Sequence, residues 1–525
     1  MSAQWKIASH SFRKHPEQTR AQGLKMIAAM ATGQPTRTIQ ASRRRSNHSL
    51  RHFGKARFSA YNSKYRNRAK VPPVSQRKIR HNILGLFLLS WCSGTLVSGA
   101  QAFEPAGRGG LLLPPGYLHT SGSQIVDEAG TPVRIAAVAW AGTDGRAGCV
   151  LQGLWQAGYD AILDSIKADG FNTVRIPWTD AALFAVAHDG PKGELAIDFA
   201  AGRNSELRGL NTLETFKKIV AYAKLVGLKI IFDHHSNEGN SGQQPNGLWF
   251  DLEPGYISVD GTFTGKVPNR GTVTDADFMR NWLTLATAFA NNPTVIGFDL
   301  HNEPSGTGNA TPHPSITWGT GNSINGKRTN DIHAMYVKLG NLLQRSNPNV
   351  LMIVEGPQYY TPPPPGYGMD TRFAAPQGNL SGVAATPVRL GIPNRVVYSV
   401  HEYPNEVAHY EPLPDHGPDY VQRMNTSWGY LVRDNIAPVF VGEMGSSMSS
   451  AGAKAWMQTL LPYLNGQQQI LDGPKFAGHQ QPVSAAWWLA GKNDGDPRGT
   501  QTRWGKGGYI PEVQKATDKL LFKAR

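Results

Sequence analysis

The sequence predicts an α/β protein built as a (β/α)8 TIM barrel, preceded by a disordered basic N-terminal segment and a signal peptide. Between residues 116 and 525, eight apolar or β-branched runs alternate with segments of helical spacing, the pattern of a parallel sheet covered by helices. Most of these runs end in polar side chains, at the position where such barrels build their sites. Eight strands over this length favour a barrel over a doubly wound sheet, and the chain has no internal repeat and no glycine-rich phosphate loop.

The positive charge of the chain is concentrated at its N-terminus. The 525 residues carry a formal charge of +15, but residues 1–82 hold 19 Lys and Arg residues and one acidic residue, Glu17, a net charge of +18. The remainder therefore has a net charge of −3. Because the globular part offers no excess of basic side chains for phosphates, no nucleic-acid partner is expected.

Residues 1–73 form a basic extension that is rich in Arg, Ser, Asn and Gln and has no sustained apolar period. Such a segment buries too little apolar surface to offset its ordering entropy, so we expect disorder. The alternative is an over-long gene prediction with a true start near Val71 or Val74, although no Met lies between Met30 and the segment that follows.

Residues 74–102 combine a basic stretch, an apolar run and a small-x-small site, which together predict a secretory signal peptide. A membrane anchor is the alternative, because 83–100 is just long enough to span a bilayer. Residues 103–115 are rich in Gly, Pro and Leu and are expected to form a linker to the barrel domain, 116–525. Removal of the signal leaves Cys149 as the single cysteine, so the mature fold must rely on its core and not on a disulfide.

The barrel elements follow in chain order. Each strand is a short β-branched or aromatic run bounded by turn residues; the predicted strands are 133–140, 172–178, 228–235, 295–304, 350–356, 395–403, 438–443 and 483–489. The helices show helical apolar spacing, with Gly170 and Gly227 as stops and Asp275 as a start; they are predicted at 154–169, 210–226, 275–291, 330–346, 428–434 and 453–464.

Polar and aromatic side chains gather at the C-terminal ends of six of these strands. Singly, each has a structural explanation, such as a hydrogen-bonded core His or a packed Trp. In a closed barrel, however, these ends form one ring, so the residues converge on one pocket. They are Arg175, Asp233, His235, Asn302, Glu303, His401, Tyr403, Glu443, Trp487 and Trp488.

Two glutamates on separate strands, Glu303 and Glu443, are what glycoside cleavage requires. One carboxyl protonates the leaving oxygen, and the other stays ionised to attack the sugar carbon or to activate water. An Arg beside the second carboxylate would keep it charged, and a Tyr hydroxyl could orient it. Asn302 could bind the sugar 2-hydroxyl, and Trp faces provide apolar platforms for pyranose rings.

These residues resemble glycoside hydrolase family 5. The stretches Gly116-Tyr-Leu-His-Thr-Ser-Gly, Gln152-Gly-Leu-Trp and Gly297-Phe-Asp-Leu-His-Asn-Glu-Pro are especially similar to its secreted bacterial endo-β-1,4-glucanases, and the similarity covers roughly residues 116–523. The resemblance implies a retaining double displacement with Glu303 as acid/base and Glu443 as nucleophile. From this resemblance and the expected signal peptide, we expect a secreted, extracellular or periplasmic monomer that acts on β-1,4-glucan without a cofactor. The supporting residues that the resemblance implies are Arg175, His235, Asn302, His401, Tyr403 and Trp488, with Trp155 stacking on substrate.

The chain departs from this family pattern at three places. Ala139 stands where the related enzymes carry Asn before a Trp. Trp488-Leu-Ala replaces their Trp-Ser-Trp, so that the second aromatic residue and the loop after it are lost. A cysteine pair of some relatives is absent, since Cys149 has no partner in the loop after His235. Mannan and xyloglucan therefore remain alternative substrates. A metal-dependent barrel hydrolase with His234, His235, His301 and His401 as ligands is a second alternative, although the first strand lacks a His-x-His pair. A barrel that binds sugar without cleaving it is the third.

Overall fold

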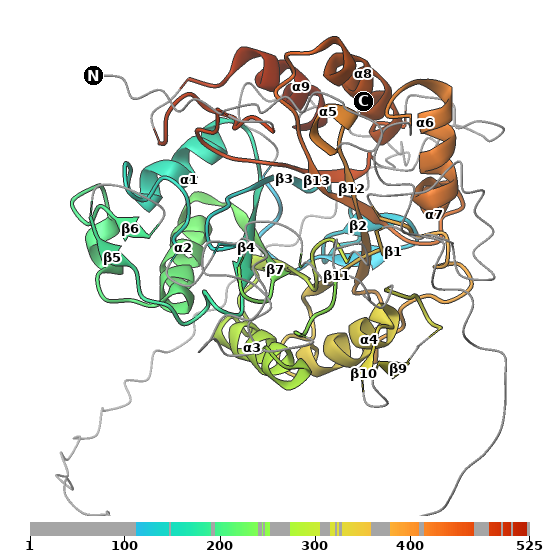
Figure 1. Ribbon diagram of the computed structural model, residues 1–525, viewed down its shortest axis with the longest axis horizontal. Coiled ribbons are helices and arrows are strands. Elements are labelled where there is room, and N and C mark those ends of the chain that lie inside the picture. The colour runs from blue at the N-terminus through green and yellow to red at the C-terminus, as the bar shows by residue number, and fades with distance from the viewer. Residues whose placement is uncertain are drawn as a thin grey trace, which may run out of the picture. The chain divides into compact units, whose positions relative to one another are not determined.

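The structure is a computed structural model (Figure 1). It describes residues 112–145, 149–190, 195–239, 244, 247–251, 273–304, 316–320, 323–324, 328–358, 378–408, 414–466, 482–494, 497–505 and 508–521. The expected extension 1–73, the expected signal peptide 74–102 and most of the expected linker 103–115 lie outside the described residues.

Eight parallel strands close into a barrel, as the sequence predicts. Each carries a β-branched or apolar run that is buried on both faces, and neighbours pair in the order β11-β12-β13-β14-β3-β4-β7-β8 before the barrel closes. The barrel strands are β3 (Ala136–Ala139), β4 (Thr173–Thr179), β7 (Lys229–Ser236), β8 (Val295–Asp299), β11 (Leu351–Glu355), β12 (Val396–Glu402), β13 (Val439–Met444) and β14 (Ser484–Trp487). Each lies within, or within one residue of, a predicted run.

Helices surround these strands in Figure 1. The longer ones are α1 (Tyr159–Ala168), α2 (Thr212–Val226), α3 (Asp275–Ala288), α4 (Ile332–Leu343), α6 (Gly417–Met424), α8 (Ala451–Leu464) and α9 (Pro511–Leu521). A π-helical turn, Asn425–Gly429, joins α6 to α7 (Tyr430–Arg433). Side-chain caps start several of them: Asn211 for α2 and Thr274 for α3 both form capping boxes, which satisfy backbone N–H groups that otherwise lack partners.

Two predicted helix bounds were wrong. The first helix begins at Tyr159 and not at Leu154, because residues 151–157 form a loop in which Gly153 takes a left-handed backbone with φ +88°, a conformation that breaks a helix. The helix predicted at 428–434 begins at Gly417 and runs through the π turn. The remaining elements are short: β5 (His188–Asp189), β6 (Ala196–Ile197), β9 (Ser323–Ile324), β10 (Arg328–Thr329), α5 (Asn405–Ala408) and a 3-10 turn, Asn204–Leu207.

Two apolar clusters hold the barrel together. The larger one fills the layer between strands and helices. The smaller one fills the barrel interior with inward residues such as Ile231, Ile353, Val397 and Phe440. A hairpin, β1 (His119–Ser121) with β2 (Gln124–Val126), pairs antiparallel and contributes Leu118 and Ile125 to this interior cluster, as does Leu113.

A buried lysine links segments at the N-terminal end of the barrel by hydrogen bonds. Lys229, the first residue of β7, donates hydrogen bonds to the carbonyl oxygens of Pro115, Gly116 and Pro293 at 2.8–2.9 Å. Its burial lowers the pKa of its ammonium group to about 8. Among the residues that the structure describes, no helix is long and apolar enough to cross a membrane.

Candidate active site

The barrel interior changes from apolar to polar along each strand. Because alternate residues of a strand point to the same face, one row on β7 runs from Ile231 through Asp233 to His235. On β12 the corresponding row runs from Val397 through Ser399 to His401. The apolar members belong to the interior cluster, and the polar members are buried at the C-terminal ends of the strands. This inward row brings the functional side chains together at one end of the barrel.

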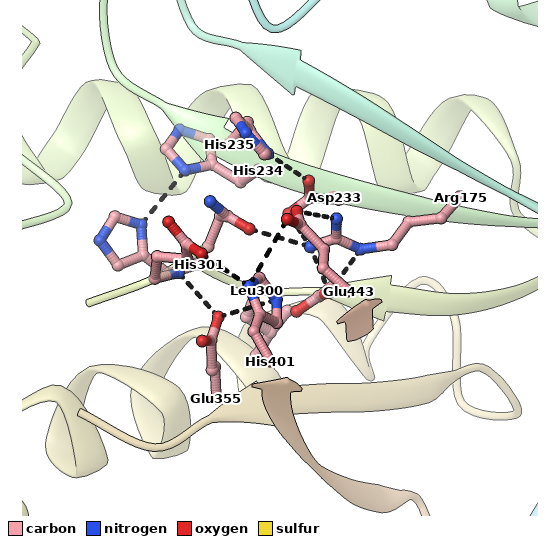
Figure 2. A network of polar contacts seen from close by, with 12 residues as sticks. Arg175, Asp233, His234, His235, Leu300, His301, Glu355, His401 and Glu443 are labelled. Atoms are coloured by element: carbon pink, nitrogen blue, oxygen red, sulfur yellow. Dashed lines mark hydrogen bonds and ion pairs between the residues drawn. The ribbon is translucent and has the colours of Figure 1, made fainter. Parts of the chain in front are cut away.

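Arg175 of β4 is the electrostatic centre of the site (Figure 2). Its side chain is fully buried. Nε donates to Asp299 Oδ2 at 3.0 Å, and Nη1 donates to Glu443 Oε1 at 2.6 Å. Nη2 lies 3.0 Å from Asp233 Oδ1 and donates to Asn302 Oδ1 at 3.0 Å. Burial alone would lower the pKa of Arg175, but the three carboxylates outweigh it and raise that pKa further above its usual range, so the guanidinium is a permanent cation.

Glu443 of β13 is held by one strong donor on each oxygen. Arg175 binds Oε1, and the Tyr403 hydroxyl donates to Oε2 at 2.8 Å. Burial, followed by the charges of Glu443 and Glu303, raises the pKa of Tyr403 well above its usual value, so its hydroxyl stays a donor. Hydrogen bonds of this kind favour the ionised carboxylate and restrict its rotation.

Glu303 follows β8 and faces Glu443 across the site. Its backbone has φ +42°, a left-handed conformation that is uncommon for a residue with a side chain. Its N–H donates to Glu355 Oε2 at 2.7 Å, and its Oε1 lies 2.8 Å from His401 Nδ1. The side chain is 15% exposed. A carboxylate oxygen of Glu303, one of Glu443 and a ring nitrogen of His401 all lie within 4.8 Å of one another.

His235 and Trp488 form a stacked pair at the rim. The rings lie 5.3 Å apart with an interplanar angle of 15°, and His235 Nδ1 binds Asp233 Oδ2 at 2.7 Å. Burial would lower the pKa of His235, but Asp233 and then Glu443 raise it to about 9. Asp233 in turn has a pKa below its usual value, because Arg175 and His235 outweigh the effect of its burial. Trp488 keeps part of its surface exposed.

Asn302 presents an unused donor beside the two glutamates. Its Oδ1 accepts from Arg175, while its Nδ2 is buried and has no hydrogen-bond partner among the described residues. Buried polar groups are normally paired, so a ligand hydroxyl is a suitable acceptor for this amide. Trp155 lies in the loop after β3, half-buried against the outer apolar cluster, and is not part of the polar network.

The structure therefore brings eight of the nine predicted site residues to one end of the barrel. Two further carboxyl groups, Asp299 and Glu355, were missed, and Asp233 was noted only as a strand-end residue. All three are inward-facing and fully buried. The signal for Glu355 was available: it lies two residues beyond Ile353 and four beyond Leu351, which are interior residues of the same strand.

The histidines proposed as metal ligands divide between two environments. His234 binds Asp180 at 2.8 Å and lies 3.4 Å from His301, whose Nε2 contacts the Gly247 carbonyl oxygen at 3.2 Å. Burial lowers the pKa of His301 to about 3. His235 and His401 lie in carboxylate groups that have ligand-like spacing. The positive charge in that cluster is already supplied by Arg175, which contacts Glu443 and Asp233 directly. Because a metal ion would have to lie beside this guanidinium, the donor set does not fit a metal ion well.

Comparisons with known proteins agree with this geometry. The family model described as cellulase (glycosyl hydrolase family 5) matches residues 126–494. An endoglucanase of Paenibacillus polymyxa is 32% identical over 391 residues, covering 73% of this chain and 82% of that protein. The major extracellular endoglucanase of Xanthomonas campestris is 26% identical and covers 67% of this chain and 63% of that protein.

Solved structures show the same fold. The complex of a Pyrococcus horikoshii endocellulase with cellotetraose aligns with a TM-score of 0.59 and 23% sequence identity, covering 78% of this chain and 100% of that chain. The match of the family model spans most of the chain, and the Paenibacillus polymyxa relative exceeds 30% identity over most of both proteins. This chain is therefore a glycoside hydrolase that belongs to family 5, the cellulase family.

Proposed function

We propose that this enzyme hydrolyses internal β-1,4-glucosidic bonds of cellulose or related β-glucans with retention of configuration, using Glu303 as acid/base and Glu443 as nucleophile. The observation that carries the proposal is the spacing of the two carboxylates, whose oxygens approach within 4.8 Å. An inverting enzyme needs room for a water molecule between its two carboxyl groups. A separation of about 5 Å leaves no such room and instead allows one carboxylate to attack the sugar directly.

The environments of the two carboxyl groups suit different tasks. Arg175 binds one oxygen of Glu443 and Tyr403 binds the other, an arrangement that fixes the carboxylate for attack on the anomeric carbon. Glu303 is partly exposed, and its carboxyl group contacts the ring of His401, an environment that suits a group that gains and loses a proton. In the first step Glu443 attacks the anomeric carbon while Glu303 protonates the leaving oxygen. In the second, Glu303 takes a proton from the water that releases the sugar from Glu443.

The substrate assignment is supported by the relatives and by the rim of the site. Proteins of 26–32% identity are named endoglucanases. The partly exposed ring of Trp488 provides a platform for a pyranose ring, and Asn302 Nδ2 provides a donor for the sugar 2-hydroxyl. The loops 238–250, 358–378 and 491–505 follow the barrel strands β7, β11 and β14 and are expected to set specificity; of these, residues 359–377 lie outside the described residues. Mannan and xyloglucan are therefore included in the test.

We also propose that the enzyme acts outside the cytoplasm as a monomer, with residues 116–525 as its catalytic domain. The expected signal peptide at 74–102 supports export, and one relative is named an extracellular endoglucanase. The N-terminal residue of the protein recovered from the culture medium tests the cleavage after Ala102, and light scattering tests the monomer.

The function is tested by assaying the purified enzyme on soluble β-1,4-glucan, mannan and xyloglucan. We expect a rapid fall in the viscosity of the glucan solution with few new reducing ends, the sign of internal cleavage. Glu443→Gln should lose at least about 10⁴-fold in kcat, while its thermal unfolding stays that of a folded protein. The matched control is Glu402→Gln, since Glu402 is a buried carboxyl on β12 that binds Tyr420 and Trp428 outside the barrel. The proposal fails if no β-1,4-linked polymer is cleaved, or if Glu443→Gln retains near-normal activity.

A further inference from the structure

A third glutamate lies beneath the two catalytic candidates. Glu355 is the last residue of β11 and is fully buried. Figure 2 shows it beside His401. Its Oε2 accepts the Glu303 backbone N–H at 2.7 Å and lies 3.5 Å from His401 Nε2, and its Oε1 accepts from Gln358 Nε2 at 3.2 Å. Glu355 thus touches both the backbone of Glu303 and the histidine that binds the Glu303 side chain.

Glu355 differs from the other buried acids of the site. Asp233, Asp299 and Glu443 each contact the Arg175 guanidinium, whereas Glu355 contacts the Glu303 backbone N–H, the Gln358 amide and the His401 ring. Burying a carboxyl group away from any permanent cation is costly, and an apolar or amide side chain would avoid that cost. A chemical role at His401 explains why an acid stands here.

We propose that Glu355 is a positioning residue for the reaction: its carboxyl group keeps a proton on His401 Nδ1, facing Glu303, and fixes the backbone of Glu303. This inference rests on the proposed role of Glu303 as acid/base. With Nδ1 protonated, the ring donates to Glu303 Oε1 across the 2.8 Å contact. The acidic proton of Glu303 must then lie on its other oxygen, where the leaving group of a substrate would be.

One proton is shared between His401 and Glu355, and His401 Nδ1 is protonated whichever of the two groups holds it. If the proton lies on His401, the ring is an imidazolium whose Nδ1–H donates to Glu303 Oε1 and whose Nε2–H faces the Glu355 carboxylate 3.5 Å away. If it lies on Glu355, the acid faces the Nε2 lone pair and the neutral ring keeps its proton on Nδ1. A glutamine at this position could not both accept the Glu303 N–H and offer a proton to His401 Nε2. Its carbonyl oxygen would accept the N–H, and that oxygen carries no proton.

The charges around the ring support this sharing. Burial would lower the pKa of His401, but Glu355, then Glu443 and Glu303, raise it to about 10. Burial raises the pKa of Glu355 well above its usual value, although His401 opposes that rise. The titratable and charged groups near the ring come from five strands and their ends: Glu355 (β11), Glu443 (β13), Glu303 and Asp299 (β8), Asp233 (β7) and Tyr403 beyond β12.

The proposal is tested by measuring how the loss of kcat/KM in Glu355→Gln depends on whether the leaving group of the substrate needs protonation. The variant is compared with wild type on two aryl β-cellotriosides, one with 4-methylumbelliferone and one with 2,4-dinitrophenol, which departs without protonation. We expect kcat/KM to fall at least about tenfold for the first and less than about threefold for the second, since only the first needs a positioned acid. The alkaline limb of kcat/KM for the first substrate should move to lower pH, because His401 without Glu355 loses its proton earlier.

Equal losses on both substrates, or no loss on either, would overturn the positioning role. Glu402→Gln is the control and should show no leaving-group dependence. Failure of wild type to cleave either glycoside would instead refute the proposed function. If Glu355→Gln does not fold, nitrogen-15 NMR of the histidines in wild type decides, with His401 assigned from a His401→Asn variant. The proposal requires a proton on Nδ1 throughout the active pH range, and a neutral ring protonated only on Nε2 contradicts it.

Discussion

Removal of a single hydroxyl from Tyr403 isolates one of the two contacts that hold Glu443. In Tyr403→Phe the ring is retained, but Glu443 Oε2 loses its 2.8 Å hydrogen bond. Among the described contacts, the next donor to that oxygen is His401 Nδ1 at 3.6 Å, which is too long for a hydrogen bond. Oε1 keeps its bond to Arg175. The carboxylate therefore keeps its ion pair with Arg175 but is free to rotate about that one contact.

The expected loss follows from the strength of a charge-assisted hydrogen bond. Such a bond contributes about 1.5–3 kcal/mol, and each 1.36 kcal/mol in the barrier is a factor of ten, so kcat should fall about 10- to 150-fold. KM for soluble β-glucan should change little, because Tyr403 acts on the nucleophile. Steady-state kinetics on that polymer give both parameters.

Tyr420→Phe is a matched control for this experiment. Tyr420 is also a buried tyrosine that donates to a buried carboxylate at 2.8 Å, but its partner is Glu402, outside the barrel. We expect this variant to lose stability and keep the wild-type kcat. A fall of less than about threefold in Tyr403→Phe, or the same loss of kcat in both variants, would refute the reasoning.

Two further predictions concern the rim and the pH dependence of stability. Trp488→Ala removes the exposed ring that stacks on His235, so KM for cello-oligosaccharides should rise about tenfold; an unchanged KM would show that substrate does not contact this ring. Burial raises the pKa of Asp169 to about 7, above its unfolded value, so the folded state holds the extra proton and wild-type stability falls as the pH rises from about 4 to 7. Asp169→Asn should therefore unfold at a higher temperature than wild type at pH 8 and at about the same temperature at pH 4; calorimetry showing one constant difference at both pH values would contradict this.

Strand positions and the polar strand ends were predictable because both depend on local pattern. A β-branched run that ends in Asn302 and Glu303 predicts a strand with polar residues at its C-terminal end. Since parallel strands point their C-terminal ends in one direction, the pattern also places these two residues at the site end of the barrel. The contacts of Arg175 show the limit of that reasoning. Its position at a strand end was visible, but its pairing with Asp299 and Glu443 joins residues 124 and 268 positions apart.

Glu355 shows what was hidden and why. A single acid between Val354 and Gly356 has the same local pattern as an ordinary strand terminus, and its meaning depends on Glu303 and His401, which come from other elements. The late start of α1 has a different cause. The apolar residues of 151–157 have helical spacing, but Gly153 at φ +88° packs beneath Trp504, more than 300 residues away, and that tertiary contact overrides the local pattern.

The central claim is that Glu443 becomes covalently bonded to the sugar while Glu303 exchanges a proton. The most direct test is to treat the enzyme with a 2-deoxy-2-fluoro-β-cellobioside carrying a good leaving group, which slows the second step, and to identify the labelled residue by mass spectrometry of peptides. We expect one 2-deoxy-2-fluoro-cellobiosyl label per chain on Glu443, with Glu443→Gln unlabelled. A label on another residue, or turnover that releases product of inverted configuration without any label, would contradict it.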